Sequence, residues 1–301
     1  MELPEAVRRN ILDLHGHAGA DRLAQISALL DFCVARWSLS LGAPYSDISY
    51  SYVLRVGQAD GTPAVLKLSF PSERVDREAD ALRAFAGRGS VALLAYDASA
   101  SAMLLERAEP GGQLAQLCES DDERATSIAA GIVRTLGRQV PANSGFPLVE
   151  TWHSDMQRIL KRIELPPLVR ALASDALAVA TELMTSSSQN LLLHGDLHQF
   201  NILASGERWL ATDPSGVVGE RECEIGPLVL NPVALLRRPG LRELVTRRIS
   251  QLCDEVGLDG RRGRGWTYVR VVLAILWSLE DHREAPAEWI ACSQLLRQNA
   301  G

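Results

Sequence analysis

Hydrophobic positions change their spacing along the chain, and the change separates two regions. Within residues 1–40, apolar side chains such as Leu23, Ile26 and Leu30 recur at steps of three and four, which predicts a helix. From Ser49 onward the spacing becomes an alternation. The segments "SYSYVLRV" and "AVLKLSF" are rich in β-branched residues, and the turn "GQADGTP" joins them. This pattern predicts a β-hairpin.

A second helix is predicted over "SERVDREADALRAFAG", with Ser72 as its N-cap and Gly87 as its end. Two further short strands lead to a Pro-Gly-Gly break at residues 110–112. Beyond the break the pattern is mostly helical, at residues 121–139, 151–163, 166–186, 241–257 and 266–281.

This order predicts an α+β protein with two lobes. Residues 1–108 would form a small β-rich N-terminal lobe with its own helices, and residues 109–301 a larger helical C-terminal lobe. A cleft between two lobes is a common place for a ligand, so we expect the binding site there.

Composition narrows the class of protein. Hydrophobic residues at 47% and charged residues at 23% are ordinary for a globular protein. A formal charge of −6 disfavours nucleic acid or an anionic membrane as partner and leaves room for a cationic small molecule. The five cysteines include no Cys-x-x-Cys, so neither a disulfide framework nor a zinc ribbon is expected. We expect a cytoplasmic protein, either monomer or homodimer, because no secretory signal and no membrane-spanning run is evident.

Polar side chains gather in the segment "LLLHGDLHQFNILASGERWLATDPSG", between strand-like apolar runs. Asp196 and Asn201 lie on one loop, and Asp213 follows the next apolar run. Carboxylate and amide oxygens are ligands that suit Mg²⁺. The segment therefore suggests a magnesium site beside a reactive carboxylate.

The same segment resembles the catalytic and metal-binding loops of protein kinases and antibiotic kinases, where an Asp, an Asn and an Asp before Gly recur in this order. In the N-terminal lobe, Lys67 within "AVLKLS" and Glu78 in the next helix match the ion pair of such enzymes. Several blocks in order are similar to the aminoglycoside/hydroxyurea antibiotic resistance kinase family, which includes streptomycin 6-phosphotransferases: "PYSDISYSYVLRVGQADGTPAVLKL", "EADALRAFAGRGSVALLAYD", "MLLERAEPG", "LLLHGDLHQFNIL", "WLATDPSGVVGE" and "VVLAILWSLED".

The resemblance implies a two-lobed protein-kinase-like fold and phosphorylation of an alcohol group on an aminoglycoside-type antibiotic such as streptomycin, with ATP and Mg²⁺. It makes Asp196 the catalytic residue that accepts the hydroxyl proton. It makes Asn201 and Asp213 the metal ligands. Lys67 would bind nucleotide phosphates, with Glu78 holding its ammonium.

Further residues follow from the resemblance. No Gly-x-Gly-x-x-Gly precedes Lys67, so Ser49 and Tyr50 would cover the phosphates. The region of Glu106 would bind adenine through its backbone. His198 would be a secondary donor near the transferred phosphate, while His194 would support the loop.

Acidic and aromatic residues after the metal loop are candidates for binding a cationic substrate. The glutamates after the metal loop are ordinarily a solvated face, and the residues near residue 281 are also consistent with a mere helix end; the candidates are Glu220, Glu222, Glu224, Trp277, Glu280 and Asp281. Departures from the family pattern at Phe200, Ser215 and Glu224 keep a kinase for hydroxyurea or another metabolite open. A nucleotide-binding regulatory pseudokinase and a zinc hydrolase built on the two loop histidines are the alternatives from other classes.

Overall fold

The computed structural model describes residues 5–45, 51–70, 72–141, 144–187 and 189–298. The chain divides into two compact units, residues 1–111 and 112–301. The sequence placed the division after residue 108. Each unit is described by itself.

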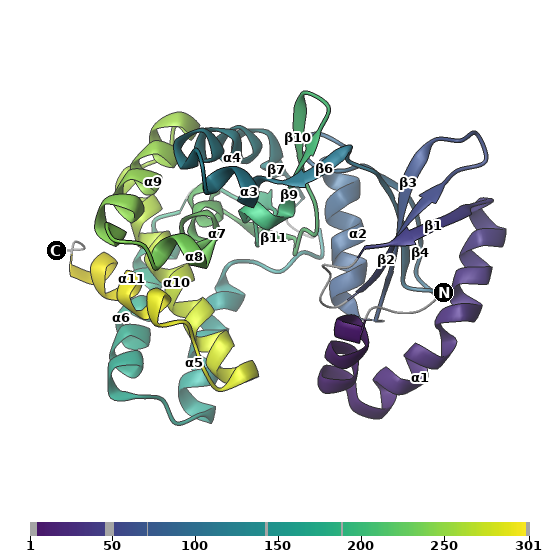
Figure 1. Ribbon diagram of the computed structural model, residues 1–301. Coiled ribbons are helices and arrows are strands. Elements are labelled where there is room, and N and C mark those ends of the chain that lie inside the picture. Colours follow the sequence, from purple (N-terminus) through teal and green to yellow (C-terminus); the bar gives the residue numbers. More distant parts are fainter. Residues whose placement is uncertain (1–4, 46–50, 71, 142–143, 188, 299–301) are drawn as a thin grey trace. The chain divides into compact units, whose positions relative to one another are not determined.

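Unit 1 contains a five-stranded antiparallel sheet in the order β1-β2-β3-β5-β4 (Figure 1). The strands are β1 (Ser40–Pro44), β2 (Ser51–Gly57), β3 (Pro63–Ser69), β4 (Leu93–Asp97) and β5 (Ala102–Glu106). The predicted hairpin is β2 and β3, which pair from Ser51 with Ser69 to Gly57 with Pro63. It is confirmed.

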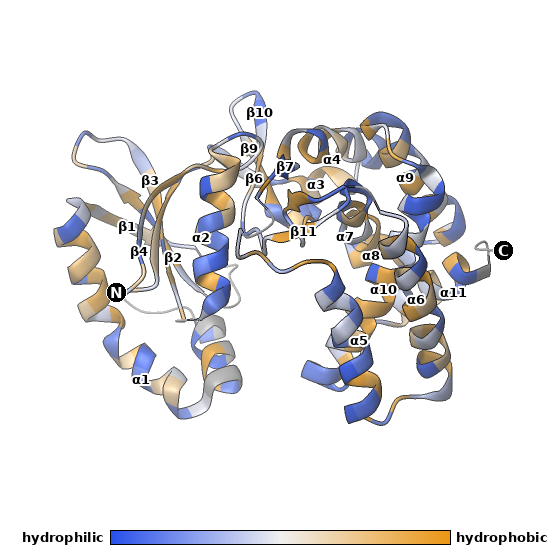
Figure 2. Cartoon of the chain, turned by 180° about the vertical axis from the view of Figure 1, so that it is seen from behind, coloured by the Kyte–Doolittle hydropathy of each residue, from blue (hydrophilic) through white to orange (hydrophobic). Residues whose placement is uncertain are grey.

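Two helices cover this sheet on opposite faces. Side chains alternate between the faces of a strand, and Leu66 and Leu68 of β3 join a core with Ile26 and Leu30 of α1 (Glu5–Trp37). Lys67, between them, contacts α2 (Glu73–Phe85). Figures 1 and 2 show the sheet between these helices. The lysine is thereby placed on the face away from the apolar core.

The ends of α2 follow the sequence signals. Ser72 stands at the N-cap position with an extended backbone, but its side chain makes no cap hydrogen bond. Ala86 adopts a left-handed conformation with φ of 52°, and Gly87 follows with φ of 72°. The predicted helix is confirmed.

Unit 2 is mainly helical. Its helices are α3 (Leu114–Cys118), α4 (Asp122–Leu136), α5 (Glu150–Arg162), α6 (Pro167–Thr185), α7 (Ile225–Leu230), α8 (Val233–Leu236), α9 (Leu241–Val256), α10 (Gly260–His282) and α11 (Ala287–Gln298). Helix α10 packs against α6, α7, α9 and α11 and is buried along much of its length. Figure 2 shows hydrophobic residues along it. The prediction of a buried helix over residues 266–281 is confirmed.

Small sheets in the orders β10-β9-β6 and β11-β8-β7 accompany these helices. The strands are β6 (Pro110–Gln113), β7 (Arg138–Gln139), β8 (Leu191–Leu193), β9 (Ile202–Ser205), β10 (Arg208–Ala211) and β11 (Val217–Gly219). The helix predicted over residues 121–139 is wrong at its end. Gly137 leaves the helical conformation with ψ of 117°, and the next two residues pair with β8.

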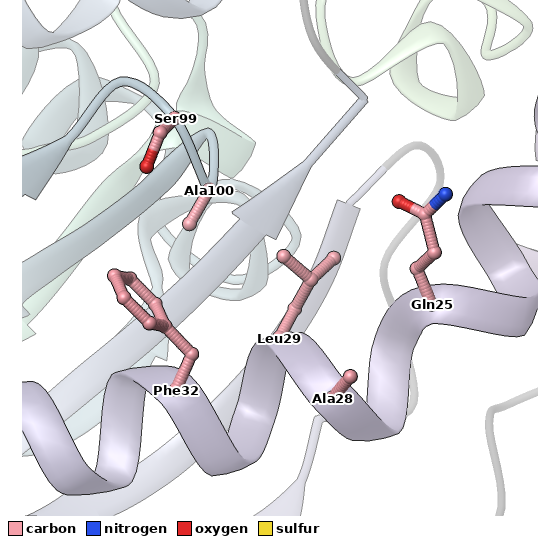
Figure 3. A pocket seen from close by; sticks show the side chains of 6 residues that line it. All are labelled: Gln25, Ala28, Leu29, Phe32, Ser99 and Ala100. Atoms are coloured by element: carbon pink, nitrogen blue, oxygen red, sulfur yellow. The ribbon is translucent and has the colours of Figure 1, made fainter.

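A hollow of about 280 Å³ lies beside α1 in unit 1, lined by Gln25, Ala28, Leu29, Phe32, Ser99 and Ala100 (Figure 3). Its lining has one amide, one hydroxyl and no charged side chain. Since it adjoins α1, it is on the face of the sheet opposite Lys67, and it offers no cation for a phosphate.

The five cysteines are buried free thiols. Across the described part of the chain, no helix combines the length and the apolar character that crossing a membrane requires.

Candidate active site

Strand β8 ends at the loop that carries Asp196. Leu192 and Leu193 are buried in the sheet between β7 and β11. Gly195 follows with φ of 83°, and a Cβ at this position would lie 2.9 Å from Cγ1 of Val217. Only glycine fits this turn without strain, so the turn from strand to loop depends on it.

His194 fixes this loop from inside the unit. Its Nε2 lies 2.8 Å from the Thr212 carbonyl oxygen, and its Nδ1 accepts the Asp196 backbone N–H at 3.3 Å. Burial lowers the pKa of the His194 imidazole to about 4, so the ring is neutral near pH 7. The expectation that His194 supports the loop is confirmed. Because both nitrogens are engaged, His194 does not fit the zinc ligand of the hydrolase alternative.

The Asp196 carboxylate has a positively charged neighbour on one oxygen and an imidazole on the other. Arg270 Nη2 lies 3.6 Å from Oδ1, and His198 Nε2 lies 3.9 Å from Oδ2. The Asp196 side chain is 46% exposed. The carboxylate is thus oriented by neighbours yet accessible to an incoming hydroxyl.

Asn201 and Asp213 are brought together by the hairpin of β9 and β10. The Thr212 N–H donates to the Asn201 carbonyl at 2.9 Å, which places Asp213 next to Asn201. Asn201 Nδ2 donates to the Asp196 backbone carbonyl at 3.2 Å. The Asn201 side-chain oxygen is therefore turned away from that carbonyl. Asp213 has a left-handed backbone with φ of 59°. An amide oxygen and a carboxylate on adjacent strand ends form a donor set that fits Mg²⁺.

In unit 1, Lys67 Nζ donates to both carboxylate oxygens of Glu78, at 2.7 and 2.8 Å. Both side chains are nearly buried, with 10% and 11% exposed. The predicted pairing is present, and Glu78 rather than the nearby Glu73 supplies it. The pair fixes an ammonium on the α2 face of the sheet.

Other predicted nucleotide contacts have mixed outcomes. Ser49 and Tyr50 lie outside the described residues. The Glu106 backbone N–H donates to the Ala92 carbonyl at 2.9 Å, and its carboxylate accepts the Ala92 N–H at 3.0 Å. These two groups of Glu106 are therefore engaged within unit 1, and its part in adenine binding stays a prediction. His198 Nδ1 is buried without a hydrogen-bond partner, and its ring packs edge-on to Phe200.

The three glutamates after the metal loop are buried, and the prediction that they line a substrate pocket is wrong. Glu220 is 4% exposed. Its two carboxylate oxygens accept hydrogen bonds from the Arg262 guanidinium, and one of them also accepts the Trp266 indole N–H. Glu222 is 7% exposed and accepts the Asp259 N–H at 3.3 Å. Buried carboxylates require such partners, so both residues stabilise the packing of η2 (Arg221–Glu224) against α10.

Glu224 binds the backbone of the loop that carries Asp196. It is 2% exposed and accepts the backbone N–H groups of His194 at 2.6 Å and Gly195 at 2.8 Å. Burial raises the pKa of the Glu224 carboxyl to about 7. This residue holds the loop of Asp196 in place and does not face a substrate.

The remaining substrate candidates lie at the end of α10. Glu280 forms an ion pair with Arg158 of α5, which lowers the pKa of its carboxyl. Trp277 is half-buried, 5.3 Å from the Arg270 guanidinium, and Asp281 is exposed. Glu280 is thus engaged in joining two helices, whereas Trp277 and Asp281 stay predictions.

Sequence reasoning missed Arg270. The signal was a single arginine within "TYVRVVLAILW", an otherwise apolar helix segment. A charge in such a segment indicates a buried partner, but the sequence does not identify it.

Comparison with known proteins agrees with the geometry. Residues 36–282 match the model of the aminoglycoside/hydroxyurea antibiotic resistance kinase family. The chain is 32% identical to a streptomycin 6-kinase of Streptomyces glaucescens over 99% of this chain and 97% of that protein. It is 34% identical to a hydroxyurea phosphotransferase of Kitasatospora aureofaciens over 100% of this chain and 87% of that protein.

A solved aminoglycoside phosphotransferase, a thermostable mutant in complex with ADP and hygromycin B, is similar in structure. The TM-score is 0.64 at 16% identity, covering 90% of this chain and 98% of that one. The predicted kinase-like fold is thereby confirmed. With the family match covering most of its length, the chain belongs to the aminoglycoside/hydroxyurea antibiotic resistance kinase family.

Proposed function

We propose that this kinase transfers the γ-phosphate of ATP to a hydroxyl of an aminoglycoside-type antibiotic, with streptomycin as the first substrate to test. The relatives at 32% identity over nearly the whole chain are named streptomycin 6-kinases. The observation that carries the proposal is the half-exposed carboxylate of Asp196. The loop of Asp196 is fixed from several sides, and the backbone carbonyl of this residue accepts a hydrogen bond from the Asn201 side-chain amide.

Asp196 would accept the proton of the acceptor hydroxyl. Phosphoryl transfer requires mainly correct placement of the reacting groups and neutralisation of charge, so a fixed carboxylate suits it. Arg270 and His198 flank the carboxylate at ion-pair distances of 3.6 and 3.9 Å, so they orient it without occupying its oxygens with hydrogen bonds. Both oxygens can therefore take up a hydroxyl proton.

Asn201 and Asp213 would hold Mg²⁺ on the nucleotide phosphates, through one amide oxygen and one carboxylate. When bound, the ion supplies positive charge against the phosphate oxygens. Lys67, held by Glu78, would also bind the nucleotide phosphates, because its ammonium is a compact positive charge. The resemblance to a phosphotransferase whose solved complex contains ADP supports ATP as the donor.

Release of ADP in the presence of a panel of acceptors tests the proposal. Streptomycin, hydroxyurea, hygromycin B and simple sugars would be supplied separately, with and without Mg²⁺. The expected result is Mg²⁺-dependent turnover with streptomycin, reduced at least about 1,000-fold in Asp196→Asn, which keeps the shape but removes the base. Nucleotide binding by that variant should be near normal. If none of the acceptors gave turnover, the result would support the pseudokinase alternative instead.

Hydroxyurea is the second candidate acceptor, because the chain is 34% identical to a hydroxyurea phosphotransferase. The ratio of kcat/KM for hydroxyurea to kcat/KM for streptomycin distinguishes the two acceptors. A ratio above about 100 in favour of hydroxyurea, corresponding to about 3 kcal/mol, would replace streptomycin as the assigned substrate.

A further inference from the structure

A buried arginine contacts the loop that carries the proposed base. Arg270 lies in the middle of α10 and is 5% exposed. Its neighbours Val269, Val271 and Val272 on the same helix are buried and apolar. Transfer of a guanidinium into such surroundings is costly, so its contacts require explanation.

Two tryptophan rings lie close to the guanidinium. Its central carbon lies 4.4 Å from the ring centre of Trp152 in α5 and 5.3 Å from that of Trp277 in α10. Both distances are within the range of cation–π attraction. Arg270 Nε and Nη1 are buried and have no hydrogen-bond acceptor. The two rings therefore replace part of the hydration that this cation has lost.

The remaining nitrogen is directed to the loop. Arg270 Nη2 donates to the Gly195 carbonyl at 3.2 Å and lies 3.6 Å from Asp196 Oδ1. Glu224 accepts the His194 and Gly195 N–H groups of the same loop. The loop is thus held by an acceptor of its N–H groups and by a donor to its carbonyl.

The backbone fixes where this arginine stands. Gly226 of α7 lies so close to α10 that a Cβ there would approach Arg270 Cβ to 2.5 Å. The close contact of the two helices therefore fixes the position from which the Arg270 side chain starts.

We infer that Arg270 is a positioning residue for the phosphoryl transfer, clamped by Trp152 and Trp277 so that its Nη2 orients the Asp196 carboxylate. A purely structural role requires only a donor to the Gly195 carbonyl, and a neutral donor would meet it without the desolvation cost of a buried guanidinium. The arginine leaves two nitrogens without hydrogen bonds and yet reaches the one carboxylate proposed to react. The inference rests on the proposed function of Asp196.

The test is a double-mutant cycle between Arg270→Met and Asp196→Asn, with kcat and KM measured for ATP and for streptomycin. Arg270→Met should lower kcat about 100-fold, as displacement of a reacting group by about 1 Å can do. The KM for ATP should stay within about threefold. In the Asp196→Asn background, Arg270→Met should lower kcat less than about threefold further, because the group it positions is already inactive.

Arg270→Lys and Arg237→Met complete the design. Lysine retains the charge but not the planar stack, so Arg270→Lys should retain more kcat than Arg270→Met, and it serves in the same cycle if the methionine variant does not fold. Arg237 is an exposed arginine of the same unit, paired with Glu288, and Arg237→Met should leave kcat unchanged. Effects of the two substitutions that multiply in the cycle, or a near-normal kcat in Arg270→Met, would overturn the inference.

Crystal structures of the wild type and the Arg270 variants separate this inference from the proposed function. The wild type should show one Asp196 rotamer beside Arg270, and the variants several. A single unchanged rotamer in the variants would overturn the positioning role. A wild type without turnover on any acceptor would contradict the proposed function, while the rotamers would still decide the role of Arg270.

Discussion

The Glu224 carboxylate accepts the backbone N–H groups of His194 and Gly195 at 2.6 and 2.8 Å. His194 in turn binds the Thr212 carbonyl, which precedes the predicted metal ligand Asp213. The two side chains thus connect the loop of Asp196 to the loop of Asp213 from inside the unit. Both are buried, and burial moves their pKa values in opposite directions from the ordinary ones.

Their titrations should therefore oppose each other in the pH dependence of stability. The His194 pKa falls from 6.5 to about 4. Between these values the unfolded chain binds more protons, so this residue lowers stability as the pH falls, by about 3 kcal/mol. The Glu224 pKa rises from 4.5 to about 7. Here the folded chain binds more protons, so this residue lowers stability as the pH rises, also by about 3 kcal/mol.

Urea unfolding between pH 4 and 7.5 measures this. Relative to the wild type, Glu224→Gln should lose stability more steeply as the pH falls from 6.5 to 4, because only the His194 titration remains. His194→Gln should show the opposite slope, with stability decreasing from pH 4.5 to 7. His282→Gln removes an exposed histidine of the same unit and should leave the wild-type slope unchanged. Parallel curves for all four proteins would contradict the two pKa changes.

The Lys67–Glu78 pair should separate stability from activity. Lys67→Met removes an ammonium from a carboxylate that is 11% exposed, and breaking a nearly buried pair in this way costs about 3–5 kcal/mol. The double variant Lys67→Met/Glu78→Leu removes both charges and should recover most of that stability. Turnover should stay at least about 100-fold reduced in both. Unfolding free energies and ADP release measured on the same preparations check this. Recovery of turnover in the double variant would exclude the proposed role of Lys67 at the phosphates.

The candidate site was predictable where its residues are close in sequence. Asp196 and Asn201 share one loop, and the short hairpin of β9 and β10 places Asp213 beside Asn201. Local spacing is sufficient to bring these groups together. Lys67 and Glu78 were predicted from the family resemblance, and the strand and the next helix that carry them bring the two side chains together.

The errors came from contacts between distant segments. Glu220 and Glu222 are separated by one residue in an acidic stretch that is typical of a surface, and their partners are on or before α10. Arg270 lies on α10, far along the chain from the loop it contacts. For residues so far apart in the sequence, periodicity and composition indicate neither which side chains are buried nor which partners they have. Both depend on how whole helices pack against one another.

The corrected role of Glu220 gives a prediction of its own. Glu220→Gln should lower the free energy of unfolding by about 3 kcal/mol, because Arg262 loses a buried carboxylate. The KM for the acceptor should stay within about twofold, since Glu220 is buried and paired with Arg262. Denaturant unfolding and acceptor kinetics measure the two quantities. Glu207→Gln, at an exposed turn of the same unit, is the control and should change neither. A tenfold higher acceptor KM with unchanged stability would restore Glu220 as a substrate residue.

The pair formed by the buried Arg248 and the partly buried Asp122 should contribute substantially to the stability of unit 2. Arg248 is fully buried and donates to both Asp122 oxygens, at 2.6 and 3.0 Å, and to the carbonyls of Val229 and Asn231, at 2.9 and 2.7 Å. Arg248→Met leaves these acceptors without that donor, so we expect a loss of about 3–5 kcal/mol in the free energy of unfolding. The exposed Arg237, whose side chain is 66% accessible and pairs with Glu288, is the matched control. Solvent weakens such a pair, and Arg237→Met should give no measurable change. Urea unfolding of both variants decides the matter, and equal midpoints would mean that the Val229 and Asn231 carbonyls find other donors when Arg248 is removed.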